Sequence, residues 1–237
     1  MKNNDEKTVQ HLAVIMDGSR RWARKNALDI AFGYSKGGVD AVKCTIEFCL
    51  NNGVSYLSLY AFSSENANRP EQEKNFLFDL IITQARSFLQ DCQVHNIRIM
   101  FVGDRSLFPA STLETIEYVE KETISFSKLQ VAVLFYYGAQ QEIIAATQAV
   151  VRYVQEHKLD AGAVTKDLFK SMLWTYPFPF PDLIIRTGNV QRLSNFLLYQ
   201  AAYSELYFLD IMWPEITHVH LQKAFDAFYA TYRTFGR

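Results

Sequence analysis

Hydrophobic residues recur in short runs that alternate with longer amphipathic segments along most of the chain. Four apolar runs of strand length, each bounded by Gly, Pro or polar residues, predict buried strands. These runs cover 11–16, 54–62, 97–102 and 129–137. A fifth predicted strand is Leu183–Ile185, bounded by Pro181 and Gly188, and a sixth is expected near 196–198.

Segments with apolar residues at helical spacing separate these runs. In 34–52, for example, Val39, Val42 and Ile46 fall on one face, and Gly53 is a natural stop. Another helix is predicted after Ser19, a residue suited to cap it. The remaining predicted helices cover about 70–94, 111–126, 140–156, 165–174 and 218–232.

Strands that alternate with helices predict an α/β fold with a central, mostly parallel six-stranded sheet, covered by helices on both faces. No repeat or low-complexity linker divides the chain, so a single domain is expected. The polar residues 1–10 are predicted to form a disordered tail, which leaves 11–237 as the domain.

Composition narrows the classes of function. Hydrophobic residues make up 49% of the chain, enough for a sizeable core, and the net charge is −1, which argues against bulk nucleic-acid binding. No apolar run approaches the length of a membrane span, and the N-terminus lacks a signal-peptide core. Three cysteines without paired spacing indicate reduced thiols of a cytoplasmic protein. His218 and His220 are more typical of a surface than of a metal site.

Polar residues follow three of the predicted strands. Asp17 and Gly18 follow the first, a loop that ends at Arg69 follows the second, and Arg186 begins a polar segment after the fifth. Ligands of parallel sheets bind at the carboxyl ends of the strands, and arginines with nearby hydroxyls suit a diphosphate. Two other interpretations remain open here: Asp17 as a turn residue, and an ordinary ion pair between Arg186 and Glu205.

Taken together, these motifs resemble those of the cis-prenyltransferases, the undecaprenyl diphosphate synthase family. The matching segments are HLAVIMDGSRRWA (11–23), LYAFSSENANRP (59–70), a long segment from PDLIIRTG to SELYF (181–208), WPEI (213–216) and RTFG (233–236). The resemblance implies Mg²⁺-dependent condensation of isopentenyl diphosphate with an allylic diphosphate to give a (Z)-polyprenyl diphosphate. It further implies a homodimer, an elongated hydrophobic tunnel, and a cytoplasmic protein whose product associates with membrane.

The resemblance implies a role for each matching residue. Asp17 would bind Mg²⁺ and assist ionisation of the allylic substrate, and Glu205 would help to place the metal. Ser63 and Asn66 match positions implicated in proton removal and in organising the diphosphates. The residues implied to bind the allylic diphosphate are Gly18, Ser19, Arg20, Arg21, Trp22, Tyr34 and Arg69. Those implied to bind isopentenyl diphosphate are Arg186, Arg192 and Ser194.

The C-terminal residues Arg233 and Gly236 match a segment that reaches across the dimer in the family. Elsewhere the chain departs from the family pattern around the allylic site. Ile30 and Tyr34 replace an Arg and a His that commonly contact the allylic diphosphate, and Ala67 replaces a Trp. Tyrosine can donate a hydrogen bond but carries no positive charge at neutral pH.

Further departures lie in and after the fourth predicted strand. Leu134, Phe135 and Tyr136 stand where small residues and an Asn are usual, and Gln140 stands in place of an Arg. Other altered positions are Ser19, Arg20, Ala139, Asn189 and Val190. Bulky side chains on a packed wall block chain growth, which favours a shorter product.

Two alternative functions remain from the sequence. The altered allylic pocket would also suit irregular, head-to-middle prenyl coupling or terpene cyclisation, because the same diphosphate and metal ligands serve either chemistry. A non-catalytic partner subunit is less favoured, because Asp17, Arg21, Arg69 and Glu205 are all present. Standard chain elongation is therefore the leading prediction.

Overall fold

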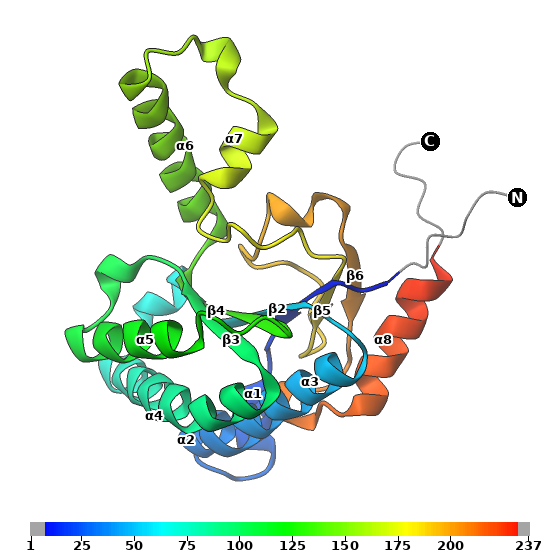
Figure 1. The fold of residues 1–237 in the computed structure, drawn as a ribbon. Coiled ribbons are helices and arrows are strands. Elements are labelled where there is room, and N and C mark those ends of the chain that lie inside the picture. The colour runs from blue at the N-terminus through cyan, green and yellow to red at the C-terminus, as the bar shows by residue number, and fades with distance from the viewer. Residues whose placement is uncertain (1–7, 232–237) are drawn as a thin grey trace, which may run out of the picture.

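Six strands form one sheet in which every neighbouring pair is parallel (Figure 1). The structure, a computed structural model, describes residues 8–231. The strands are β1 (His11–Ile15), β2 (Tyr56–Ser63), β3 (Ile97–Val102), β4 (Leu129–Tyr137), β5 (Leu183–Arg186) and β6 (Glu205–Phe208). Their spatial order is β3-β4-β2-β1-β5-β6, so β1 lies inside the sheet between β2 and β5. The predicted bounds of β3 and β4 are confirmed.

Eight α-helices occur in the described part of the chain. They are α1 (Ser19–Lys25), α2 (Ile30–Phe32), α3 (Val39–Asn51), α4 (Glu71–His95), α5 (Ala110–Thr123), α6 (Ala139–Glu156), α7 (Lys166–Ser171) and α8 (His218–Ala230). The predicted helix over 34–52 is two elements, because a π-helix at Gly33–Gly38 precedes α3. Ser19 is the first residue of α1 and Gly18 is its N-cap, so the expected serine cap is wrong.

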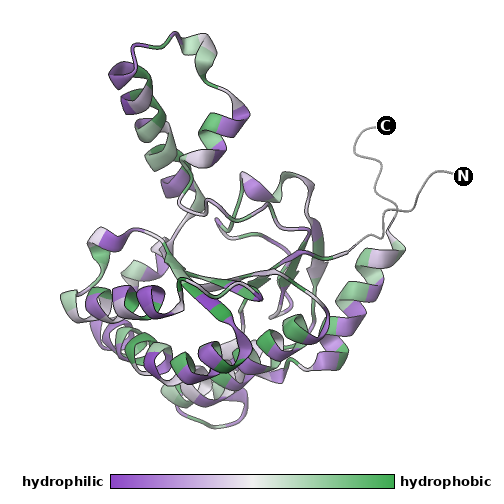
Figure 2. Cartoon of the chain, in the orientation of Figure 1, coloured by the Kyte–Doolittle hydropathy of each residue, from purple (hydrophilic) through white to green (hydrophobic). Residues whose placement is uncertain are grey.

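The two faces of the sheet are covered differently. Alternate residues of β1 enter different clusters: Leu12 and Val14 pack with buried residues of α3, α4, α5 and α8, whereas Ala13 and Ile15 face the other side. Figure 2 shows the green, apolar sides of these helices turned toward the sheet. Helices flank the sheet as predicted, but they lie mainly on this first face, and the second face is covered mainly by irregular segments before and after β5, 174–182 and 187–199.

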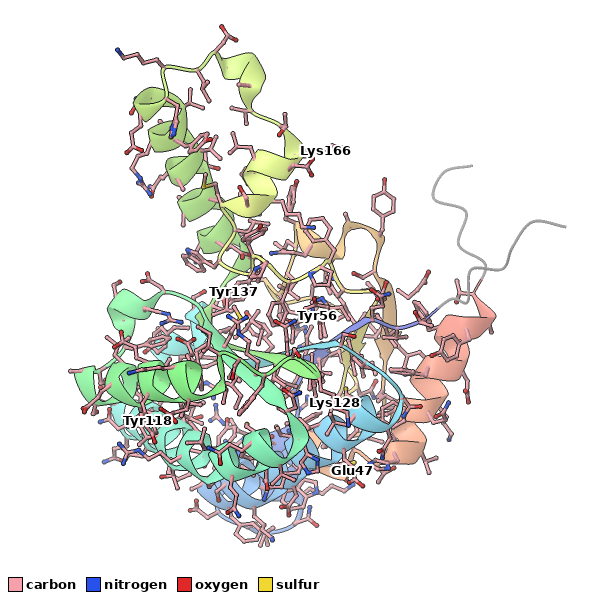
Figure 3. All side chains as sticks on the ribbon, in the orientation of Figure 1. Glu47, Tyr56, Tyr118, Lys128, Tyr137 and Lys166 are labelled. Carbon is pink, nitrogen blue, oxygen red and sulfur yellow. The ribbon has the colours of Figure 1, made fainter. Side chains whose placement is uncertain are left out.

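The helices α6 and α7 project from the body as an arm (Figure 1). Figure 3 places Tyr137 at the base of this arm and Lys166 on the arm itself. A fully buried carboxylate, Glu142, fixes the base: it accepts hydrogen bonds from the hydroxyl of Tyr137 at 2.5 Å and from Nε2 of Gln200 at 2.8 Å. The amide and hydroxyl of Thr175 donate to the same carboxylate. This network joins α6 to the segments that precede and follow β5.

The sixth strand lies at Glu205–Phe208, so its prediction near 196–198 is wrong. Phe196 and Leu197 are buried, as their hydrophobicity predicts, but Leu197 has a φ of 47° and Asn195 one of 62°. Positive φ values are incompatible with a strand. The apolar run therefore folds into a tight loop that fills the second face of the sheet.

At the ends of the chain, Val9 is buried and precedes β1, whereas residues 1–7 lie outside the described range. Arg233 and Gly236 also lie outside it. Within residues 8–231, none of the helices combines the length and the apolarity that a membrane span requires. Cys44 is partly exposed, Cys49 and Cys92 are buried, and all three are free thiols.

Candidate active site

A polar pocket of about 810 Å³ lies at the carboxyl ends of β1, β2 and β5. Strand register explains why distant motifs meet there: Ile15 pairs with Tyr60 on one side and with Arg186 on the other. The charged and hydroxyl- or amide-bearing residues that line it are Asp17, Ser19, Arg20, Arg21, Arg24, Tyr34, Tyr60, Ser63, Glu65, Asn66, Arg69, Arg186, Ser194 and Asn195. Five of these are arginines and two are carboxylates, so the pocket suits a polyanion.

Asp17 lies between two guanidinium groups. Its Oδ2 is 2.9 Å from Nη2 of Arg186, and its Oδ1 is 3.1 Å from Nη2 of Arg21. Its backbone carbonyl accepts hydrogen bonds from the hydroxyl of Thr187 at 2.7 Å and from the amide of Trp213 at 3.0 Å. Residues that follow β5 and β6 thus fix the position of Asp17. A residue that only formed a turn would not need these contacts, which favours a role in the site.

Gly18 allows the chain to turn from β1 into α1 beside Asp17. Its φ is 114°, and a Cβ there would lie 2.8 Å from Sδ of Met212. The positive charge on this side of the pocket comes from the α1 side chains Arg20, Arg21 and Arg24. Trp22 does not line the pocket; its ring lies against Gly37.

Tyr34 and Arg69 meet on the outer side of the pocket. Arg69 Nη1 donates to the Tyr34 hydroxyl at 2.9 Å and lies 3.0 Å from Oε1 of Glu73, to which the hydroxyl donates at 3.3 Å. Arg20 lies 3.8 Å from the same oxygen. Burial raises the pKa of Tyr34, and Glu73 adds to this, whereas Arg69 opposes it. The phenol is therefore neutral at physiological pH.

Ser63 and Asn66 lie where β2 ends, and Nδ2 of Asn66 donates to Oγ of Ser63 at 2.6 Å. Across the pocket, Arg186 is almost completely buried and donates to Oγ of Ser194 at 2.7 Å and to the carbonyl of Arg192 at 2.5 Å. Nε of Arg186 has no hydrogen-bond partner in the described structure. The side chain of Arg192 is not among the residues that line the pocket.

Glu205 is not brought to this pocket within the chain. It pairs in register with Leu183, whereas Arg186 pairs with Phe208. Three residues along a strand correspond to about 10 Å, so Glu205 lies at the opposite end of the sheet from Asp17. No group of three or more His, Cys, Asp or Glu side chains that could hold a metal ion occurs in residues 8–231. His218 and His220 are therefore not part of such a group.

An apolar cavity of about 190 Å³ adjoins the polar pocket. Its lining comes from α3, α4 and the strands β2, β3 and β4. Met16, Ser19, Tyr34 and Ala61 line both spaces, so the polar pocket and the cavity lie on either side of these residues. Phe135 lines the cavity, whereas Leu134 packs on the other face of the sheet. Fold and pockets thus define a protein suited to a phosphorylated ligand with an apolar chain.

Several residues of the site are not among those predicted. They are Arg24, Tyr60, Glu65, Glu73 and Asn195. Glu73 could have been found, because it follows Arg69 by four positions at the start of a predicted helix, where such pairs meet. The contact between Glu65 and Asn195 joins residues 130 positions apart, and no local pattern indicates it.

Comparison with known proteins agrees with the fold and the pocket. The family model described as "Putative undecaprenyl diphosphate synthase" matches residues 15–236. The chain belongs to this family and is a prenyltransferase of the cis type.

Among curated relatives, the chain is 40% identical over 228 residues to the ditrans,polycis-undecaprenyl-diphosphate synthase of Pseudomonas aeruginosa, covering 96% of this chain and 90% of that protein. It is also 40% identical over 227 residues to the isoprenyl transferase of Agrobacterium fabrum, covering 96% and 92%.

Two solved structures share the fold. Lavandulyl diphosphate synthase from Lavandula x intermedia, in complex with dimethylallyl diphosphate, superposes with a TM-score of 0.94 at 29% identity over 98% of this chain and 100% of that chain. A probable undecaprenyl diphosphate synthase from Campylobacter jejuni superposes with a TM-score of 0.80 at 33% identity, with the same coverage.

Proposed function

We propose that this prenyltransferase condenses isopentenyl diphosphate with an allylic diphosphate and releases a (Z)-polyprenyl diphosphate. The proposal is supported above all by the adjacency of the polar pocket and the apolar cavity, which share Met16, Ser19, Tyr34 and Ala61. A diphosphate bound among the arginines would extend its hydrocarbon chain into the cavity. The cavity would then serve as the product tunnel.

In this proposal the two diphosphates occupy opposite sides of the pocket. Arg20, Arg21 and Arg69 lie on the side of the allylic substrate, and Arg186 with Ser194 on the side of isopentenyl diphosphate. When the allylic C–O bond breaks, negative charge develops on the leaving diphosphate, and fixed guanidinium groups stabilise that charge. The apolar wall keeps water from the allylic cation.

Ser63 and Asn66 are proposed to act on the proton lost from isopentenyl diphosphate, which is released together with the leaving diphosphate. Their hydrogen bond at 2.6 Å, donated by Asn66, holds the serine oxygen at the edge of the pocket. The serine hydroxyl can take up that proton as it gives its own to an oxygen of the leaving diphosphate. Arg192 contributes through its carbonyl, which orients Arg186.

The residues present fit a magnesium ion. Mg²⁺ usually keeps one or two protein carboxylates and takes its other ligands from phosphate oxygens and water. Asp17 offers one carboxylate in the pocket, and the orphan Nε of buried Arg186 indicates that a further acceptor, such as a phosphate oxygen, belongs there. When bound, the ion neutralises charge on the diphosphate.

We also propose a homodimer. Because Glu205 lies at the far end of the sheet from Asp17, it can serve the metal only from a second copy. The edge strand β6 exposes Leu206, and Leu198 is exposed in the preceding loop. Exposed apolar side chains on an edge strand favour pairing with another chain. A long product would associate with a membrane surface through its hydrocarbon chain.

Irregular coupling or cyclisation is the less favoured function. The curated relatives at 40% identity are named undecaprenyl diphosphate synthase and isoprenyl transferase, which supports elongation.

The test is transfer of label from isotope-labelled isopentenyl diphosphate into an extractable apolar product, with dimethylallyl, geranyl or farnesyl diphosphate as the primer. Incorporation that depends on Mg²⁺ and is abolished by EDTA supports the proposal. Consumption of the allylic diphosphate in arms without isopentenyl diphosphate, with no label incorporated in its presence, would contradict it.

A further inference from the structure

Asn195 connects the two sides of the polar pocket. We propose that Asn195, through its hydrogen bond to Glu65, is a positioning residue that sets the Ser63–Asn66 pair relative to the Arg186 site. The inference rests on the proposed function, because it concerns how the two bound diphosphates are aligned. Neither residue need contact the reacting atoms for this role.

The first part of the connection is to the arm. The backbone carbonyl of Asn195 accepts from the amide of Ala139 at 2.8 Å, and its Oδ1 accepts from the amide of Gln140 at 2.9 Å. Asn195 therefore caps the N-terminus of α6 from 55 positions downstream in the chain. Because the base of α6 is also fixed by buried Glu142, this cap anchors the loop that contains Asn195 to the body of the protein.

The second part is to the loop after β2. Nδ2 of Asn195 donates to Oε1 of Glu65 at 2.7 Å and to Oε1 of Gln141 at 3.1 Å. Glu65 lies in the 3₁₀ helix Ser64–Asn68, which contains Asn66 and directly follows Ser63. Burial raises the pKa of Glu65, but hydrogen bonds, that of Asn195 foremost, lower it below its ordinary value. The carboxylate is thus ionised and accepts strongly.

The third part of the connection joins Asn195 to the Arg186 side of the pocket. Ser194 directly precedes Asn195 and accepts from Arg186 at 2.7 Å. Its carbonyl accepts from the hydroxyl of Tyr60 at 3.2 Å. Ser194 and Asn195 have φ values of 51° and 62°, so the backbone here is a sharp left-handed turn with little freedom to adjust. A displacement of Asn195 therefore moves the hydroxyl that orients Arg186.

The amide of Asn195 also lies close to Gly138. A Cβ on Gly138 would lie 2.7 Å from Nδ2 of Asn195, so a side chain at this position would push against the amide. The reacting atoms of the two substrates must approach to about 3–3.5 Å, and a misplacement of about 1 Å can cost about a hundredfold in rate. A connection that sets the spacing of the two sides is consequently expected to act on kcat rather than on the binding of either substrate alone.

Asn195→Asp isolates the bond to Glu65. Aspartate keeps the Oδ1 acceptor for α6, tolerates a positive φ, and is favourable beside a helix N-terminus, so the fold is retained. The variant loses the amide group that donates to Glu65 and places the carboxylates of residues 195 and 65 side by side. We expect kcat to fall about tenfold or more while each KM stays within about threefold. Because a close carboxylate pair shares a proton, part of the loss should be recovered as the pH is lowered.

Rescue supplies the decisive comparison. In the double variant Asn195→Asp with Glu65→Gln, the glutamine amide donates to the new carboxylate, so the bond is restored with its direction reversed. We expect kcat to return most of the way to the wild-type value, and the acid recovery to disappear. Asn96→Asp is the matched control, because Asn96 is also left-handed, accepts a backbone amide at 2.8 Å through Oδ1, and does not line either pocket.

All variants are compared by steady-state kinetics with both substrates varied, and their folding by the urea midpoint. A kcat of Asn195→Asp within twofold of wild type, or a double variant as impaired as the single one, would overturn the inference. Wild-type protein that forms no product with any primer would instead contradict the proposed function and remove the premise of the inference.

Discussion

The carboxylate of Asp17 is the residue-scale centre of the site, held between Arg186 and Arg21. We expect Asp17→Asn to lower kcat by at least about a hundredfold, because the variant loses the negative charge that serves the metal and the leaving group. Asparagine is preferred to alanine, since its oxygen still accepts from buried Arg186 and avoids leaving that cation without a partner. Circular dichroism checks the fold. A folded variant with normal turnover would remove Asp17 from the mechanism.

Tyr34 gives a second residue-scale prediction, because the family commonly has a histidine there. The raised pKa of its phenol keeps it neutral, so Tyr34 itself adds no step to the pH dependence of KM for the allylic diphosphate near the ordinary pKa of histidine. We expect Tyr34→His to lower that KM progressively as the pH falls and the imidazole becomes a cation. The measurement is KM of both proteins across this range. Identical profiles would show that the position does not contact the diphosphate.

At the scale of elements, the sequence predicts β3 and β4 well because each is a short apolar run with clear turn residues at its ends. The same criterion fails at 196–198, where buried apolar residues form a loop with positive φ values. Hydrophobicity reports burial but not backbone conformation. It likewise could not indicate that the second face of the sheet is covered mainly by the irregular segments 174–182 and 187–199 rather than by helices.

His11 ties β1 to the irregular segment before β5 and makes stability depend on pH. It is buried between the carbonyl of Pro179, at 2.7 Å from Nδ1, and Oγ of Ser58, at 2.9 Å from Nε2. Burial lowers the pKa of His11 to about 4, although the bond to Pro179 opposes this. As the pH falls below about 6.5, His11 takes up a proton in the unfolded chain but not in the folded protein. The free energy of unfolding therefore decreases below that pH.

The expected loss attributable to His11 is about 2 kcal/mol between about pH 7.5 and about pH 5, at 1.36 kcal/mol per pKa unit. The free energy of unfolding in urea, measured for wild type and His11→Gln at both values, isolates this term, because the other histidines are common to both proteins. The variant should be less stable at the higher pH and lose less on acidification. Parallel pH dependence in the two proteins would contradict the assignment.

Phe135 on β4 is the element-scale candidate for limiting product length. It lines the apolar cavity and packs against Phe62, Phe78 and Phe108, with ring centroids 5.2–5.5 Å away. Phe135→Leu should lengthen the product, because it removes volume from the wall at a smaller cost than alanine would. Phe108→Leu is the control, since Phe108 belongs to the same aromatic group without lining the cavity. Equal product lengths in both variants would exclude Phe135 as the limit.

At the scale of the whole molecule, much of the site could be predicted because strand order brings the ends of β1, β2 and β5 to one edge. Asp17, Ser63, Arg69, Arg186 and Ser194 meet there as the motifs indicate. Other predicted members are placed elsewhere: Glu205 at the opposite end of the sheet, Trp22 against Gly37. A sequence motif indicates which residues belong to a site. It does not show at which end of a strand each residue lies, or which copy of the chain supplies it.

The proposed dimer is tested at the edge strand. Leu206 on β6 is 45% exposed, and Leu206→Arg should convert the protein from dimer to monomer by placing a charge in the contact. Leu107→Arg, at a residue 50% exposed beside the opposite edge strand β3, should leave the dimer intact. Light scattering after size-exclusion chromatography gives the masses. A wild-type monomer, or a dimer in both variants, would contradict this interface.

The polar pocket and the apolar cavity are proposed to form one elongation site. The decisive measurement is mass spectrometry of the products formed with Mg²⁺, labelled isopentenyl diphosphate and a short allylic diphosphate. We predict a ladder of products, each longer than the last by one isoprene unit and each additional unit labelled, with a ceiling set by the cavity. A product that contains only the carbon of the allylic substrate would contradict it.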